Sequence, residues 1–135
     1  MSAHNIELIR GLYEAFGRGD VPAVLGIFDA DIEWHEADGL PYGGIHRGPD
    51  AVASGVFAPL MEDVPDFRLA PQEFFESGDR VVALGQYTGT ARKSGAALDL
   101  PFAHAWTVSD GKVTHFHQHV DTVKFNEALT GQPAN

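Results

Sequence analysis

The stretch PFAHAWTVSDGKVTHFHQHVDT, residues 101–122, predicts two long β-strands joined by a tight turn. Residues 109–111, SDG, have turn chemistry, and so short a connection makes the flanking strands an antiparallel hairpin. In the first strand Phe102, His104 and Trp106 alternate with small or polar residues. Successive side chains of a strand point to opposite faces, so these three are expected to face the core or an internal cavity.

Three histidines occupy alternate positions of the second strand and share one face. They are His115, His117 and His119. Either they face inward with Asp121, or Phe116 and Val120 face inward and Gln118 lines the cavity. Imidazoles in a narrow cavity are costly without a metal or hydrogen bonds, which favours outward histidines. A metal site completed by Asp121 is the weaker alternative, and a β-bulge is a further way to bring His119 or Asp121 to the cavity mouth.

Two titratable residues on expected inner faces are candidates for proton transfer. His104 is either a core histidine satisfied by a neighbouring group or a pocket histidine whose pKa is set by burial and a partner. Residues 31–36 predict an earlier strand in which Trp34 and Glu36 share the inner face. A carboxylate beside aromatic rings resists ionisation and is a candidate general base; the alternative is a solvated carboxylate at the cavity rim.

Helical patterns come first in the chain and strand patterns follow. Apolar spacing predicts a helix over residues 6–16, a second over 20–28 and a third that starts at 48 and is interrupted at Pro59. The expected strands are residues 31–36, 67–76, 80–92, 97–109 and 112–123, with a loop over 37–48. This order is an α+β layout. The polar tail, from about residue 129, is expected to be flexible.

Composition limits the classes of partner. The 135 residues predict one domain, and the net charge of −10 argues against nucleic acid and membrane surfaces as partners. The absence of cysteine excludes disulfides and thiol chemistry. No secretory signal or apolar run long enough to span a bilayer is recognised, so the cytoplasm is the expected location.

Segments along nearly the whole chain, from about residue 5 to 128, resemble one known family. LYEAFGRGDVPAVLGIFDADIEWHE, LPYGGIHRGPDAVASGVF and PFAHAWTVSDGKVTHFHQHVDT are similar to the SnoaL-like branch of the NTF2-like superfamily. That superfamily includes ketosteroid isomerase, polyketide cyclases, scytalone dehydratase and limonene epoxide hydrolase. The resemblance implies an NTF2-like cone: three N-terminal helices packed in a strongly curved, mostly antiparallel sheet around an apolar pocket. It also implies a homodimer formed through the outer face of the sheet.

The resemblance assigns roles to individual residues unevenly. It sets Glu36 at the isomerase's carboxylate proton shuttle and His104 at the protonated aspartate that donates to the substrate oxyanion. The tyrosine of that oxyanion site falls at Leu12, with Tyr13 one residue away, which argues against steroid isomerisation. Asp121 matches an acid/base aspartate near the last strand of polyketide cyclases.

Two functions from different classes fit these residues. The first is a cofactor-free, metal-free enzyme using acid/base chemistry on a small, mostly apolar carbonyl compound, as an isomerase, cyclase or dehydratase would. Its expected catalytic residues are His104, Asp121 and Glu36. The expected pocket residues are Trp34, Tyr42, Phe57, Met61, Phe102, Trp106, Phe116 and Gln118. The second is a non-catalytic module that binds a small hydrophobic ligand in the same pocket.

Overall fold

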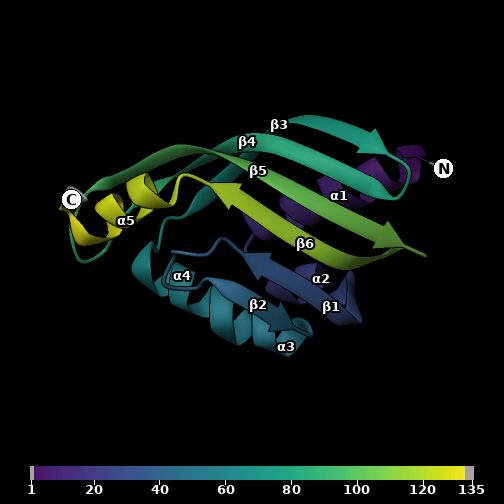
Figure 1. Ribbon diagram of the computed structural model, residues 1–135, viewed down its shortest axis with the longest axis horizontal. Coiled ribbons are helices and arrows are strands. Elements are labelled where there is room, and N and C mark those ends of the chain that lie inside the picture. The colour runs from purple at the N-terminus through teal and green to yellow at the C-terminus, as the bar shows by residue number, and fades with distance from the viewer. Residues whose placement is uncertain (1, 133–135) are drawn as a thin grey trace.

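One curved, six-stranded sheet organises residues 2–132, the part of the chain that the computed structural model describes (Figure 1). The strands are β1 (Phe28–Glu36), β2 (Gly44–Arg47), β3 (Arg68–Ser77), β4 (Arg80–Thr90), β5 (Ala97–Ser109) and β6 (Lys112–Val120). Their order across the sheet is β2-β1-β6-β5-β4-β3. Neighbours are antiparallel except β1 and β6, which run parallel.

Most of the helices cover one face of this sheet. They are α1 (Ser2–Gly17), α2 (Val21–Gly26), α3 (Pro49–Val52), the π-helical turn η1 (Ala53–Phe57), α4 (Ala58–Asp63) and α5 (Thr122–Thr130). In Figure 1, α1 and α2 lie behind the sheet and α5 lies at one end. This arrangement confirms the predicted α+β class with an N-terminal helical layer. Within residues 2–132, no helix is both long and apolar enough to cross a membrane.

The third predicted helix is continuous but changes type along its length. The π-turn η1 ends at Phe57, directly before α4, and Pro59 is the second residue of α4. Proline has no N–H to donate and its ring crowds the carbonyl four residues earlier, here that of Gly55. The wider π-turn accommodates that ring without ending the helix, which accounts for the interruption predicted at this residue.

The segment predicted as a loop over residues 37–48 contains the short edge strand β2. Positive φ values of 114° at Gly44 and 87° at Gly48 let the chain turn at both ends of this strand. β2 pairs with β1, and the Arg47 guanidinium lies 2.7 Å from the Glu33 carboxylate. The glycines that suggested a loop therefore delimit a strand of four residues.

The strand predicted over residues 112–123 ends at Val120, and Thr122–Thr130 form the helix α5, which the sequence patterns did not predict. Asp121 caps the helix, because its Oδ1 accepts a hydrogen bond from the Lys124 backbone N–H at 3.0 Å. Gly131 ends it in the left-handed conformation. The helix is held to the protein by Phe125, which is only 1% exposed. Residues 133–135 of the predicted tail lie outside the described residues.

The strand parity predicted for the core is confirmed. On β5, Phe102, His104 and Trp106 are buried, whereas the alternating Ala103 and Ala105 are partly exposed. The cross-strand partners continue this inner face onto neighbouring strands: Trp106 pairs with Phe116 on β6, and Phe116 pairs with Trp34 on β1. The concave face of the sheet is therefore aromatic along three consecutive strands.

Gly85 on β4 leaves the space that the Phe102 ring fills. A Cβ at this position would lie 2.6 Å from Phe102 Cζ and 2.3 Å from the Ala70 carbonyl oxygen. We expect Gly85→Ala to lower the free energy of unfolding by about 1–3 kcal/mol, the usual cost of overpacking. The control is Gly11→Ala on α1, where a Cβ would meet nothing within 4 Å. It should raise that free energy by up to about 1 kcal/mol. Urea unfolding of both variants tests this pair; equal effects would contradict the packing role of Gly85.

Candidate active site

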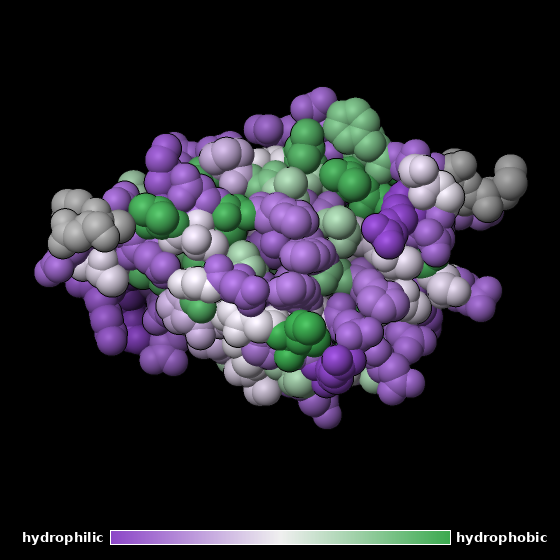
Figure 2. All heavy atoms as spheres, in the orientation of Figure 1, coloured by the Kyte–Doolittle hydropathy of each residue, from purple (hydrophilic) through white to green (hydrophobic). Residues whose placement is uncertain are grey.

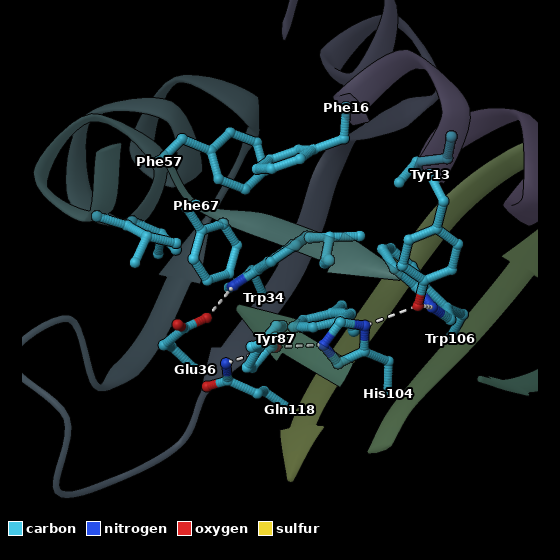
Figure 3. Close-up of a pocket in the computed structure, with 15 residues that line it drawn as sticks. Tyr13, Phe16, Trp34, Glu36, Phe57, Phe67, Tyr87, His104, Trp106 and Gln118 are labelled. Atoms are coloured by element: carbon cyan, nitrogen blue, oxygen red, sulfur yellow. Dashed lines mark hydrogen bonds between the residues drawn. The ribbon is translucent and has the colours of Figure 1, made fainter. Parts of the chain in front are cut away.

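A small cavity lies between the concave face of the sheet and the helices. Its volume is about 40 Å³, and its lining is almost entirely apolar. Figure 3 shows Phe16, Phe57 and Phe67 on one side of it and His104 and Gln118 on the other. Glu36 and His104, two of the predicted catalytic residues, both line this cavity. So do the predicted pocket residues Trp34, Phe57, Trp106, Phe116 and Gln118.

His104 lies between two tyrosine hydroxyl groups (Figure 3). Its Nδ1 is 2.7 Å from the Tyr13 hydroxyl of α1, and its Nε2 is 2.5 Å from the Tyr87 hydroxyl of β4. Each hydroxyl also accepts a hydrogen bond, from Trp106 Nε1 to Tyr13 at 3.0 Å and from Gln118 Nε2 to Tyr87 at 2.9 Å. Five side chains from four elements thus form one buried hydrogen-bonded chain.

Burial keeps His104 neutral, and the partners of its ring nitrogens are the uncharged hydroxyls of Tyr13 and Tyr87. The ring is 4% exposed and stacks on Phe102 with ring centroids 4.0 Å apart. Desolvation lowers the pKa of His104 to about 3, with a smaller contribution from His119. Burial also raises the pKa of both Tyr13 and Tyr87 well above the usual value for tyrosine. At neutral pH the chain from Tyr13 to Tyr87 therefore consists of uncharged groups.

Glu36 is the acidic residue that lines this cavity. It ends β1, is 2% exposed, and accepts a hydrogen bond from Trp34 Nε1 at 2.8 Å. The Gln118 amide also favours the ionised form of Glu36, and the Ala37 backbone N–H, 3.0 Å from Gln118 Oε1, fixes that amide. Desolvation outweighs both effects and raises the pKa of Glu36 from 4.5 to about 7. Such a carboxyl group can both accept and release a proton near neutral pH.

Three predicted pocket residues lie close to the cavity but do not line it. Phe102 lies beside it and stacks on His104 and Tyr87. The Tyr42 hydroxyl donates to Asp63 Oδ2 at 2.8 Å, and Met61 lines a separate surface groove next to Phe67. These three predictions fail for the same reason. Sequence spacing indicates which face of an element is buried, but it does not indicate which part of that face borders a cavity.

Asp121, the third expected catalytic residue, does not line the cavity that His104 and Glu36 share. Its side chain is exposed, and it caps α5 instead. β6 ends at Val120, and no register shift occurs between β5 and β6 over the stretch from His115 to Val120. Without a bulge there, residue 121 has no means of turning into the cavity.

The three histidines of β6 lie on the outer face of the sheet, as the favoured alternative predicted. His115, His117 and His119 are exposed, whereas Phe116 and Gln118 are buried. The rings stack rather than converge: the centroid of His117 is 4.1 Å from that of His35 and 4.4 Å from that of His119. Among residues 2–132, no three acidic or histidine side chains are arranged to hold a metal ion. Figure 2 views this outer face and shows its centre as mostly hydrophilic.

The fold agrees with the comparisons to known proteins. The sequence matches the model of the SnoaL-like domain over residues 9–116. The chain belongs to the SnoaL-like domain family. No curated protein matches the sequence.

Solved structures of similar fold support the assignment of this chain to the SnoaL-like family. An NTF2-like protein of unknown function from Burkholderia pseudomallei K96243 is 38% identical, with a TM-score of 0.88 over 96% of this chain and 99% of that one. TerC, co-crystallised with polyporic acid, is 34% identical, with a TM-score of 0.86 over 94% and 98%. A protein of Jannaschia sp. CCS1, named as a SnoaL-like polyketide cyclase, is 20% identical, with a TM-score of 0.83 over 98% and 96%; it shows likeness of fold.

Tyr13 and Tyr87 are site residues that the sequence analysis of this SnoaL-like chain did not select. Tyr13 follows Leu12, the residue aligned with the isomerase tyrosine, and both line the cavity because neighbouring residues of a helix differ by only about 100°. Tyr87 shares the inner parity of β4 with Val81 and Ala83. Strand alternation alone was therefore sufficient to place Tyr87 inside.

The raised pKa of Glu36 gives a testable pH dependence of stability. The folded state binds the Glu36 proton more tightly than the unfolded state, so this contribution to stability is present below about pH 4.5 and is lost as the pH rises to about 7. The full loss is about 3 kcal/mol, since a tenfold change in proton affinity corresponds to about 1.4 kcal/mol.

Between pH 4.5 and pH 8 we expect wild type to lose up to about 3 kcal/mol of unfolding free energy relative to Glu36→Gln, because glutamine does not titrate. Comparing the two proteins at each pH removes the contributions of the other titrating groups, including His104. Urea unfolding across this range measures the shift. A difference that is independent of pH would contradict a raised pKa of Glu36.

Proposed function

We propose that this SnoaL-like protein is a small enzyme, independent of any cofactor, that transfers protons on a small, mostly apolar carbonyl compound. The observation that carries the proposal is the nearly fully buried carboxyl group of Glu36, which lines the same cavity as Tyr13 and Tyr87. Burial there raises the pKa of Glu36 to about 7. Removal of a proton next to a carbonyl needs a base of this strength and a donor to the developing enolate oxygen.

Each group has a role in that chemistry. Glu36 takes the proton from the carbon next to the carbonyl group and returns it to another atom of the substrate. The donor to the enolate oxygen is a tyrosine hydroxyl, because both nitrogens of His104 are already engaged by Tyr13 and Tyr87. His104 then orients the tyrosines. Isomerisation, cyclisation and dehydration share this first step.

The aromatic walls favour an apolar substrate. Trp34, Phe57 and Phe116 surround the carboxyl side of the cavity, and the ring centroids of Trp34 and Phe116 lie 3.7 Å apart. The present volume of about 40 Å³ has room for only a few atoms, so a larger substrate requires the helix-side rings to move. That TerC was co-crystallised with polyporic acid supports an organic ligand for this fold.

The second candidate is a binding module without chemistry. It is favoured by the hydrogen bonds that the polar cavity groups already make to one another, since a self-satisfied set of groups can simply anchor a ligand. Both functions use the same residues, so only a measurement of proton transfer separates them.

Deuterium exchange in D₂O tests the proposal without knowledge of the natural substrate. Small cyclic and aryl ketones are incubated with the protein, and loss of the α-proton signal is followed by NMR. We expect at least one ketone to exchange faster with the protein than with buffer, with a rate that rises as pH passes through about 7. Ketones that bind, as seen by chemical-shift changes, but exchange only at the buffer rate would favour the binding module.

We also propose that two copies associate through the outer face of the sheet. Stacked rings of His35, His117 and His119 and the exposed side chain of Ile45 provide contact surface there. Light scattering at micromolar concentration is expected to give twice the chain mass of 14.6 kDa. A monomer mass would contradict this association. A dimer that survives Ile45→Glu would contradict the choice of face.

A further inference from the structure

The hydrogen atoms of the His104 network do not match its acceptors. Trp106 donates to the Tyr13 oxygen and Gln118 donates to the Tyr87 oxygen. Between these two hydroxyls, a neutral imidazole offers one N–H and one bare nitrogen. One tyrosine must therefore donate to His104, while the other accepts from it. The hydroxyl hydrogen of the accepting tyrosine has no acceptor among residues 2–132.

Both arrangements contain the same hydrogen bonds. With the proton on Nε2, Tyr13 donates to Nδ1 and the Tyr87 O–H is free; with the proton on Nδ1, Tyr87 donates and the Tyr13 O–H is free. Neither arrangement gains or loses a hydrogen bond relative to the other, so hydrogen bonding alone does not select one of them. Both tyrosines line the cavity, which makes it the space into which the free hydrogen can rotate.

We propose that Tyr13, His104 and Tyr87 form a donor switch, in which the tautomer of His104 decides which tyrosine presents its free O–H to a ligand in the cavity. The donor switch rests on the proposed function, which supplies the ligand: the free O–H donates a hydrogen bond to the oxygen of the carbonyl substrate. It adds a second donor position and makes His104 a positioning residue for both.

The switch moves one proton across the cavity wall without changing the charge of the protein. When the proton leaves Nε2, it passes to the Tyr87 oxygen, and Tyr87 gives its own hydroxyl proton to the ligand or to cavity water. At the same time Tyr13 gives its proton to Nδ1 and takes one from the ligand or water. One proton thus enters at Tyr13 and one leaves at Tyr87, and the reverse change runs the other way.

Removing either hydroxyl should fix the tautomer, in opposite senses. In Tyr13→Phe, a proton on Nδ1 would be a buried N–H with no partner, and a ring N–H cannot rotate to find one. The proton should therefore be on Nε2, and the free hydroxyl of Tyr87 can still rotate toward the cavity. By the same reasoning, Tyr87→Phe should place the proton on Nδ1.

Nitrogen NMR of protein labelled with ¹⁵N-histidine measures this directly. Protonated and bare ring nitrogens resonate at well-separated frequencies, and the signals of His104 are those missing from His104→Gln. We expect opposite tautomers in Tyr13→Phe and Tyr87→Phe. The same tautomer in both variants would overturn the proposal, since a fixed network would not respond to which hydroxyl is lost.

If Tyr13→Phe does not fold, Gln118→Met can take its place in the comparison of His104 tautomers with Tyr87→Phe. Gln118→Met leaves the Tyr87 oxygen without its other donor, so the proton should again favour Nε2; a shift toward Nδ1 would overturn the proposal. These spectra need no substrate. Deuterium exchange can therefore fail while the two tautomers are found, and the tautomers can be absent while exchange is found, so the switch and the proposed function are tested separately.

Discussion

Glu36→Gln is expected to slow protein-dependent deuterium exchange of a responsive ketone by about 10²- to 10⁴-fold, the usual contribution of a general base. Glutamine has nearly the same shape and can still accept a hydrogen bond from Trp34 Nε1, but it cannot take a proton. The cavity should therefore keep its ketone affinity within a small factor. Exchange rates and chemical-shift titrations of the same samples measure both quantities.

Glu33→Gln is the matched control for this variant. Glu33 lies on the same strand with its side chain on the opposite face, where it contacts Arg47 and His115. Its loss should leave the exchange rate unchanged. A Glu36→Gln protein that exchanges the ketone as fast as wild type would remove Glu36 from the mechanism and shift attention to the tyrosine hydroxyls as the proton-transferring groups.

Phe125→Ala is expected to lower the free energy of unfolding by about 3–5 kcal/mol, as for other large aromatic residues removed from a core. The Phe125 ring is 1% exposed and meets Tyr42 and Tyr87 edge to face, with centroids 6.4 Å and 6.2 Å away. It is the main apolar anchor of α5, so the loss should also detach this helix. Urea unfolding followed by fluorescence and circular dichroism measures the change.

Val123→Ala on the same helix provides the comparison. Val123 is 52% exposed, and its truncation should cost no more than about 0.5 kcal/mol. Equal losses from the two variants would mean that α5 contributes to stability through its helical propensity and not through the Phe125 contact. A Phe125→Ala protein as stable as wild type would contradict the role of Phe125 as the anchor of α5.

Features that depend on periodicity were predicted well from the sequence. Alternation of large and small residues on β5 placed Phe102, His104 and Trp106 inside, and the cost of three buried imidazoles placed the histidines of β6 outside. Both inferences depend on where a side chain points along a regular strand, which local sequence determines. The order of helices and strands follows from the same patterns.

Features that depend on the junctions between elements were predicted poorly. Asp121 was expected in the cavity, but a residue directly after a strand can equally begin a helix. Asp121 caps α5, where its carboxylate accepts a hydrogen bond from the Lys124 backbone N–H. β2 was hidden by its flanking glycines, Gly44 and Gly48. Tyr13 was set aside in favour of Leu12, because an alignment fixes a helical position only to within one residue.

The most direct test of this account is the titration of Glu36 itself. Carbon NMR of protein labelled at the glutamate carboxyl carbon follows each carboxyl group, and Glu36→Gln identifies the signal of Glu36. We expect a midpoint at about pH 7, because burial in an aromatic cavity outweighs the hydrogen bond from Trp34 and the nearby Gln118 amide. A midpoint near 4.5, the ordinary value for glutamate, would mean that Glu36 is solvated and ionised at neutral pH, and it would contradict the general base proposed here.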